Sequence, residues 1–152
     1  MTSSGSYTVT VTDANGCSAV SAPTVVTVNA NPVATITASG ATTFCQGGTV
    51  TLTAGTGTSY LWSNNATTQS ITASTTGTFT VTVANANGCT SVSAPVTVTV
   101  NQLPLATITA NGPTAFCQGG SVTLVSTPGV SYLWSGNNAI TQSNTVTTSG
   151  TY

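Results

Sequence analysis

Residues 49–53 have the sequence Thr-Val-Thr-Leu-Thr, in which apolar and hydroxyl side chains alternate strictly. A period of two places Val50 and Leu52 on one face of an extended chain and the threonines on the other. Threonine is favoured in strands, and its hydroxyl hydrogen-bonds water without adding charge. The segment therefore predicts a β-strand that is buried on one face only.

The same alternation recurs through the middle of the chain, and no segment shows the 3.6-residue period of a helix. The predicted strands cover residues 34–38, 49–53, 60–62, a short stretch around Ile71, 79–83 and 96–100. Turn signals separate them, at Gly47-Gly48, Asn64-Asn65 and Asn87-Gly88. Six or seven short strands with such turns predict an all-β fold of immunoglobulin-like antiparallel sandwiches.

The chain repeats itself with a period of about 72 residues. Residues 44–48, Phe-Cys-Gln-Gly-Gly, return at 116–120, and the Asn-Gly-Cys of residues 15–17 returns at 87–89. The offset grows to 73 beyond one inserted residue near Gly136. This period is far longer than a solenoid coil and suits one small sandwich domain per repeat.

Short proline-bearing links at 29–32 and 101–104 separate the repeats. Only one repeat is then complete, in residues 31–102. Residues 1–30 correspond to the C-terminal strands of an incomplete repeat, and residues 103–152 correspond to the N-terminal strands of another.

The charge of the chain excludes most biochemical functions. The 152 residues contain no Lys, Arg or His and one acidic residue, Asp13, for a formal charge of −1. Nucleic-acid binding needs cations, and acid–base or triad catalysis needs titratable groups. We therefore expect no enzymatic activity, no catalytic residue, no cofactor and no nucleic-acid partner. No apolar stretch approaches the length of a membrane span, so no membrane insertion is expected either.

Four cysteines, two per period, are the candidate disulfide residues: Cys17, Cys45, Cys89 and Cys117. They lack the close pairs of a zinc site, so no metal is expected. Two pairings remain open. Cys45 could bond Cys89 within the complete repeat, or each could bond a cysteine across a junction with a neighbouring repeat. Strand order supports the second pairing, because Cys45 precedes the second strand and Cys89 follows the sixth, which puts them at opposite ends of a Greek-key sandwich. A strongly displaced first strand would instead allow the first pairing, so both stay open.

The predicted core consists of the inward-facing residues of the complete repeat: Val50, Leu52, Tyr60, Trp62, Phe79, Val81 and Val83. Exposed tryptophan can stack on sugars, but a tryptophan on the third strand of a sandwich usually fills the core. Asp13 lies in an Asp-Ala-Asn-Gly turn, where a backbone cap is the expected role because the equivalent residue is Asn85.

Together, residues 44–48, 59–63, 77–83 and 87–89 resemble the immunoglobulin-like and PKD-like tandem repeats of large cell-surface adhesins and extracellular filaments of Bacteroidota. The acidic turn that follows the tryptophan in PKD repeats is replaced here by Ser63-Asn64-Asn65. The resemblance implies an extracellular, cell-surface stalk or filament unit whose partners are neighbouring repeats or copies of itself, joined head to tail. The incomplete repeats at 1–30 and 103–152 could, in addition, complete each other in separate copies by strand complementation. The alternative is a carbohydrate-binding module of a secreted protein, in contact with a glycan or a surface.

Overall fold

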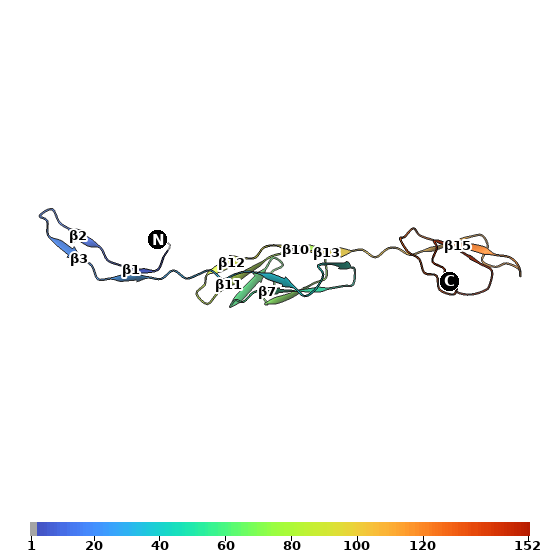
Figure 1. Ribbon diagram of the computed structural model, residues 1–152, viewed down its shortest axis with the longest axis horizontal. Helices are drawn as coiled ribbons and strands as arrows, with labels where there is room; N and C mark the ends of the chain where they lie inside the picture. The colour runs from blue at the N-terminus through green and yellow to red at the C-terminus, as the bar shows by residue number, and fades with distance from the viewer. Residues whose placement is uncertain (1–2) are drawn as a thin grey trace. The chain divides into compact units, whose positions relative to one another are not determined.

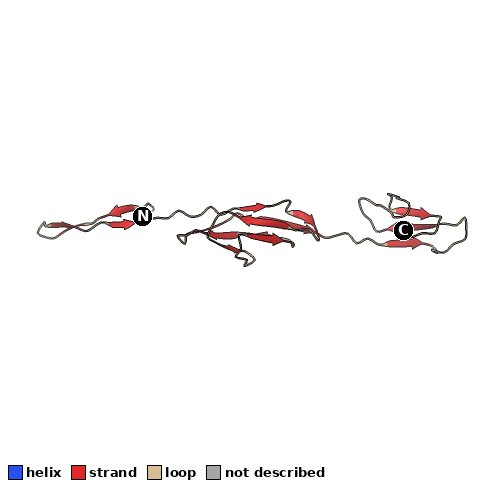
Figure 2. Cartoon of the chain, turned by 90° about the horizontal axis from the view of Figure 1, so that it is seen from below, coloured by secondary structure: helices blue, strands red, loops and turns tan. Residues whose placement is uncertain are grey.

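The computed structural model describes residues 3–152, and within them every regular element is a β-strand (Figure 2). The all-β prediction is confirmed. The chain divides into two compact units, one ending at Asn101 and the other covering Gln102–Tyr152. Figure 1 colours both by residue number.

The complete repeat contains one sheet of three antiparallel strands. Its central strand β7 (Val50–Ala54) pairs with β5 (Ile36–Ala38) on one side and with β9 (Ser70–Ala73) on the other. Along β7, buried and half-buried residues alternate, as the sequence pattern predicts. The threonines face away from the core. On that outer face, the hydroxyls of Thr53 and Ser70 are joined across the strands by a hydrogen bond of 3.1 Å.

The facing strands form two ladders that follow each other along one long hairpin. In the first, β11 (Val81–Ala84) pairs with β8 (Ser59–Trp62) and with β12 (Thr90–Val92). In the second, β13 (Val96–Asn101) pairs with β10 (Gly77–Phe79) and with β6 (Thr43–Cys45). The two ladders differ in register by one residue, which makes a bulge around Ser93. There Ser93 Oγ accepts a 3.1 Å hydrogen bond from the Val81 amide.

The first part of the repeat contributes to both sheets. β5 lies in the sheet with β7, whereas β6, a few residues later, adds to β13 as a parallel neighbour. In this register Cys45 lies opposite Asn101. The start and the end of the repeat are therefore hydrogen-bonded to each other.

One apolar cluster fills the space between the sheets. Its buried members come from both faces: Val50, Leu52, Ala54, Trp62, Ile71, Ala73, Val81, Val83 and Val98. Of the predicted core residues, Tyr60 and Phe79 are half-buried and pack against this cluster. One three-stranded sheet and two facing three-stranded ladders that share one core are consistent with a β-sandwich.

The N-terminal segment forms the same two hairpin ladders as the complete repeat, but each ladder has two strands, because no strand equivalent to β6 or β8 joins it within the described residues. β1 (Gly5–Tyr7) pairs with β4 (Thr24–Val26), and β2 (Thr10–Thr12) pairs with β3 (Ser18–Val20). Gly5 lies opposite Val26 just as Gly77 lies opposite Val98, so the register is the same 72 residues later. The apolar side chains stay exposed, however: Val9 is 58% exposed, whereas its equivalent Val81 is 0% exposed.

The second unit reproduces the first sheet of the complete repeat. It contains β14 (Ile108–Asn111), β15 (Val122–Ser126) and β16 (Ser143–Val146), paired antiparallel with β15 in the centre. Val122, Leu124, Trp134 and Val146 form a smaller buried cluster. The indole N–H of Trp134 donates to Thr141 O at 2.8 Å, and that of Trp62 donates to Thr68 O at 2.8 Å.

Candidate functional site

Two groups of polar contacts lie at the ends of the complete repeat, where the chain enters and leaves. At the entry, the turn between β11 and β12 is closed by Asn85. Its Oδ1 accepts from the amides of Asn87 at 3.0 Å and Cys89 at 3.1 Å. Gly88 completes the turn with a φ of 79°, a left-handed conformation that glycine adopts without strain.

This turn also contacts the link that precedes the repeat. Asn85 Nδ2 donates to Ala30 O at 2.8 Å, and Cys89 Sγ lies 3.8 Å from Asn29 O. A side-chain amide has both a donor and an acceptor, so Asn85 can close its own turn and bind the link at the same time. The link is therefore anchored to the first turn beyond β11.

The equivalent turn of the N-terminal segment has Asp13 in place of Asn85. Asp13 Oδ1 accepts from the amides of Asn15 and Cys17, each at 2.9 Å. The expected backbone cap is confirmed. A carboxylate has no N–H group, so the turn of Asp13 lacks the donor with which Asn85 holds a link.

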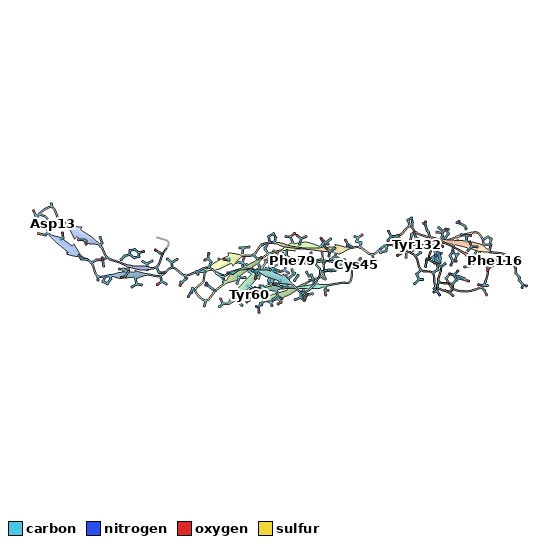
Figure 3. All side chains as sticks on the ribbon, viewed as in Figure 1. Asp13, Cys45, Tyr60, Phe79, Phe116 and Tyr132 are labelled. Carbon is cyan, nitrogen blue, oxygen red and sulfur yellow. The ribbon has the colours of Figure 1, made fainter. Side chains whose placement is uncertain are left out.

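At the exit of the repeat, β6 holds the last residues of β13. The Gln46 amide donates to Asn101 O at 2.8 Å, and the Gly48 amide donates to Cys45 O at 3.0 Å to close the following turn. Figure 3 shows Cys45 at the end of the repeat where β13 finishes. The sequence does not predict β6, because the segment Thr43–Cys45 is too short to show apolar alternation.

The four candidate disulfide residues are unpaired in the structure; Cys89 is half-buried, and Cys17, Cys45 and Cys117 are exposed. Cys45 and Cys89 lie at opposite ends of the repeat. The extended chain from Cys89 through β12 and β13 to Asn101 covers roughly 40 Å. Cysteines so placed cannot bond each other without rearrangement of the sandwich.

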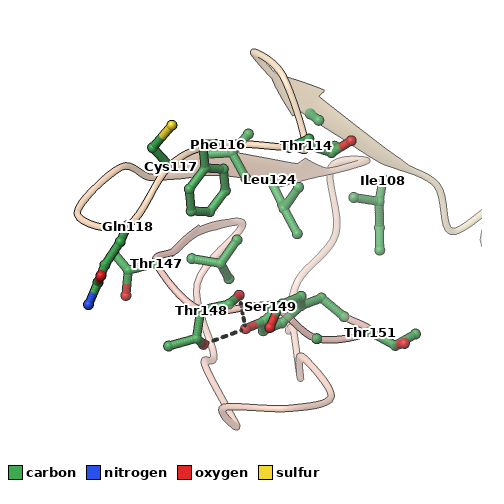
Figure 4. Close-up of a pocket in the computed structure, with 16 residues that line it drawn as sticks. Ile108, Thr114, Phe116, Cys117, Gln118, Leu124, Thr147, Thr148, Ser149 and Thr151 are labelled. Atoms are coloured by element: carbon green, nitrogen blue, oxygen red, sulfur yellow. Dashed lines mark hydrogen bonds between the residues drawn. The ribbon is translucent and has the colours of Figure 1, made fainter.

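The second unit has an open groove of about 820 Å³ where the first sheet lacks a facing sheet. Figure 4 shows Ile108, Phe116 and Leu124 along its wall. The Thr148 and Tyr152 hydroxyls, which also line the groove, are hydrogen-bonded to each other at 3.0 Å. The equivalents of these wall residues, Ile36, Phe44 and Leu52, belong to or pack against the closed core of the complete repeat. The groove is therefore the uncovered face of a sandwich core.

Trp62 is 1% exposed and its indole N–H is already bonded to Thr68 O, so its ring has no free face for a sugar. Among residues 3–152, no group of three or more His, Cys, Asp or Glu is placed to hold a metal ion. Nor does this described part contain a helix long and apolar enough to cross a membrane.

No protein-family model matches the chain, and no curated protein matches it significantly.

Proposed function

We propose that this chain is a segment of a non-enzymatic stalk or filament, built head to tail from immunoglobulin-like domains and exposed on a bacterial surface. The observation that carries the proposal is the repeated register. The hairpins of residues 5–26 pair as residues 77–98 do, and β14–β15–β16 pair as β5–β7–β9 do. Recurrence of the same pairing along one chain is typical of a linear array of identical domains.

The strand order supports an immunoglobulin-like domain. Strands β5, β7 and β9 share one sheet, and β8 pairs with β11 on the facing side. If β5 and β6 are counted as two parts of one first strand, this division corresponds to the two sheets of the immunoglobulin sandwich, and the buried Trp62 lies on the third strand, β8, as in that fold.

The contacts of the link support a stiff array. The Asn85 and Cys89 side chains both reach the link residues before the repeat, and the link itself contains Pro32. A short link that is bonded to the next domain restricts the angle between successive repeats. Fixed angles add up to an extended rod, whereas a flexible link would give a random coil of domains.

The proposed partners are neighbouring repeats or other copies of the chain. The hairpins of residues 5–26 have exposed apolar side chains, and the second unit has an open groove whose lining includes the apolar residues Ile108, Phe116 and Leu124. Each part lacks what the other supplies in the complete repeat, which is the condition for strand complementation. The extracellular location rests on the resemblance to surface adhesins and on the disulfides expected from two cysteines per repeat, which persist in oxidising compartments.

An extended chain tests the proposal. Residues 1–152 are followed by residues 8–152 of a second copy, so that Tyr152 takes the place of Tyr7 and the open repeat is completed. We expect the maximum dimension from small-angle X-ray scattering to grow in proportion to the number of repeats. The control carries Gly-Ser insertions in both links, and its size should grow roughly as the square root of repeat number. Equal growth in both chains would overturn the stalk proposal.

Location is tested separately. Antibodies raised against the complete repeat should label intact cells of the source bacterium as strongly as permeabilised ones. Labelling only after permeabilisation would contradict a surface stalk.

A further inference from the structure

Two cysteines approach the same position of the repeat, one from each side of a junction. At the exit of the complete repeat, Cys45 lies opposite Asn101, and the next residue, Gln46, donates its amide to Asn101 O at 2.8 Å. At the entry, Cys89 Sγ lies 3.8 Å from Asn29 O. Asn29 and Asn101 are the same residue of the repeat, 72 positions apart.

The shared carbonyl oxygen brings the two side chains together in a continuous array. At a junction with complete repeats on both sides, the preceding repeat places its Cys45-type residue beside the link. The following repeat places its Cys89-type thiol beside the same link carbonyl. The strand that carries the Cys45-type residue lies about 4.8 Å from the link strand beside it. The Cys89-type sulfur atom lies 3.8 Å from the carbonyl of the same link residue, so both cysteines adjoin one residue, and a disulfide between them requires Cα atoms roughly 4.4–6.8 Å apart. We propose that the Cys45-type cysteine of each repeat forms a disulfide with the Cys89-type cysteine of the next repeat.

This pairing leaves every cysteine of the 152-residue chain without a partner in the same chain. Cys45 pairs with the Cys89-type residue of the repeat that begins at residue 103, which lies beyond Tyr152. Cys117 pairs with the Cys89-type residue of the repeat after that one. Each bond forms when two thiols lose two protons and two electrons to a disulfide oxidant, which is reduced to two thiols. Oxidised glutathione or a protein disulfide is sufficient for this exchange.

The accessibility of the thiols fits this chemistry. Cys45 is exposed and Cys89 is half-buried, so an oxidant can reach both ends before neighbouring repeats close over the junction. The inference rests on the head-to-tail array proposed above, and it adds a covalent connection between domains that are already joined through the backbone.

The two-copy chain described above tests the pairing. It is refolded with oxidised and reduced glutathione, digested without reduction and mapped by mass spectrometry. Trypsin has no site because the chain contains no Lys or Arg, so chymotrypsin is used. We expect two disulfides: Cys45 of the first copy with Cys17 of the second, and Cys117 of the first copy with Cys89 of the second. Each bond lowers the intact mass by about 2 Da, since two hydrogens leave.

Two controls make the test specific. In the two-copy chain with Cys45→Ser in the first copy, the first disulfide should be lost and the second retained. The single 152-residue chain, kept dilute, should retain four thiols that react with a thiol reagent under native conditions.

A bond between Cys45 and Cys89 of the same copy would overturn the proposal. Eight free thiols in a two-copy chain that scattering shows to be an extended row of folded repeats would also overturn the disulfide proposal. That result would leave the stalk proposal intact. If scattering shows no extended row, the array proposal fails, and with it the junction that the disulfide requires.

Discussion

At the bulge between the two ladders, the side-chain oxygen of Ser93 accepts the hydrogen bond of a strand amide in place of a backbone carbonyl. It is 7% exposed, and its Oγ accepts from the Val81 amide, whose residue is fully buried. The change Ser93→Ala leaves this amide buried without a partner, which should cost about 1–3 kcal/mol of folding free energy. Urea unfolding measures the loss, with Trp62 fluorescence as the probe in a Trp134→Phe background.

The N-terminal segment offers a matched control. Ser21 Oγ accepts from the Val9 amide at 3.0 Å, but both residues are exposed. Water can replace that bond, so Ser21→Ala should change stability by less than about 0.5 kcal/mol. If the two substitutions had equally small effects, the prediction that burial makes the Ser93 hydrogen bond important for stability would be wrong.

The turn between β11 and β12 combines two tasks that one substitution can separate. Asn85→Asp keeps the Oδ1 acceptor, as Asp13 does in its own turn, but removes the donor to Ala30 O. The stability of the repeat should stay within about 0.5 kcal/mol of the parent. The backbone order parameters of the link, from ¹⁵N relaxation, should fall below the value of about 0.85 that is typical of rigid backbone.

Asn87→Asp is the control for charge, since it adds the same carboxylate to the same turn and leaves the Asn85 bond in place. A link that becomes equally mobile in both variants would assign the effect to charge rather than to the lost hydrogen bond.

Strands that carry their own alternating pattern could be predicted from sequence, and strands made by a partner could not. Residues 49–53 predict β7 to within one residue, and Val50 and Leu52 are buried as the period requires. Residues 43–45 form β6 only because β13 lies beside them. The same Phe-Cys segment at 116–117 is not a strand in the second unit, where no such partner is paired.

The contacts of the link were equally invisible in the sequence. Alternation places side chains on faces, but it does not reveal that Asn85 reaches Ala30, 55 residues earlier. Asp13 stands at the position equivalent to Asn85. From this difference the sequence predicts that both residues cap a turn, but it does not predict that Asn85 also donates a hydrogen bond to the link.

At the scale of the molecule, stability should be nearly independent of pH and salt. Histidine is the side chain whose ordinary pKa falls between pH 5 and 8, and the chain has none, nor any Lys, Arg or Glu. The urea midpoint should therefore stay constant between about pH 5 and 8, since folding changes no proton binding there. It should also stay constant from about 0.01 M to 1 M NaCl, although the Debye length falls tenfold. A midpoint that moves by more than the fitting error over either range would contradict this.

Copies of the 152-residue chain should associate head to tail. Val9 and Val11 are 58% and 64% exposed, whereas their equivalents Val81 and Val83 are fully buried against the first sheet. The groove of the second unit has that same sheet uncovered, and a hairpin from a second copy can cover it. Tyr152 already lines this groove and must move for Tyr7 to enter, so association should be reversible. Sedimentation velocity should show oligomers that grow with concentration.

The double variant Val9→Asp and Val11→Asp separates association from folding. Both side chains are exposed in the single chain, so the charges cost little there, but they cannot be buried in a partner groove. The variant should sediment as a monomer at every concentration, and oligomers as large as those of the parent would exclude the hairpin as the associating element.

The parallel pairing of β6 with β13 determines how a repeat responds to tension. When such a chain is pulled, force enters before β5 and leaves after Asn101, so β6 and the end of β13 are drawn past each other along their length. The hydrogen bonds that join them, from Thr99 to Thr42 and from Gln46 to Asn101, lie across that direction. They must break together rather than one after another. A repeat so small, with no ion pairs to hold it, thus resists tension best along the axis on which the proposed stalk would be loaded.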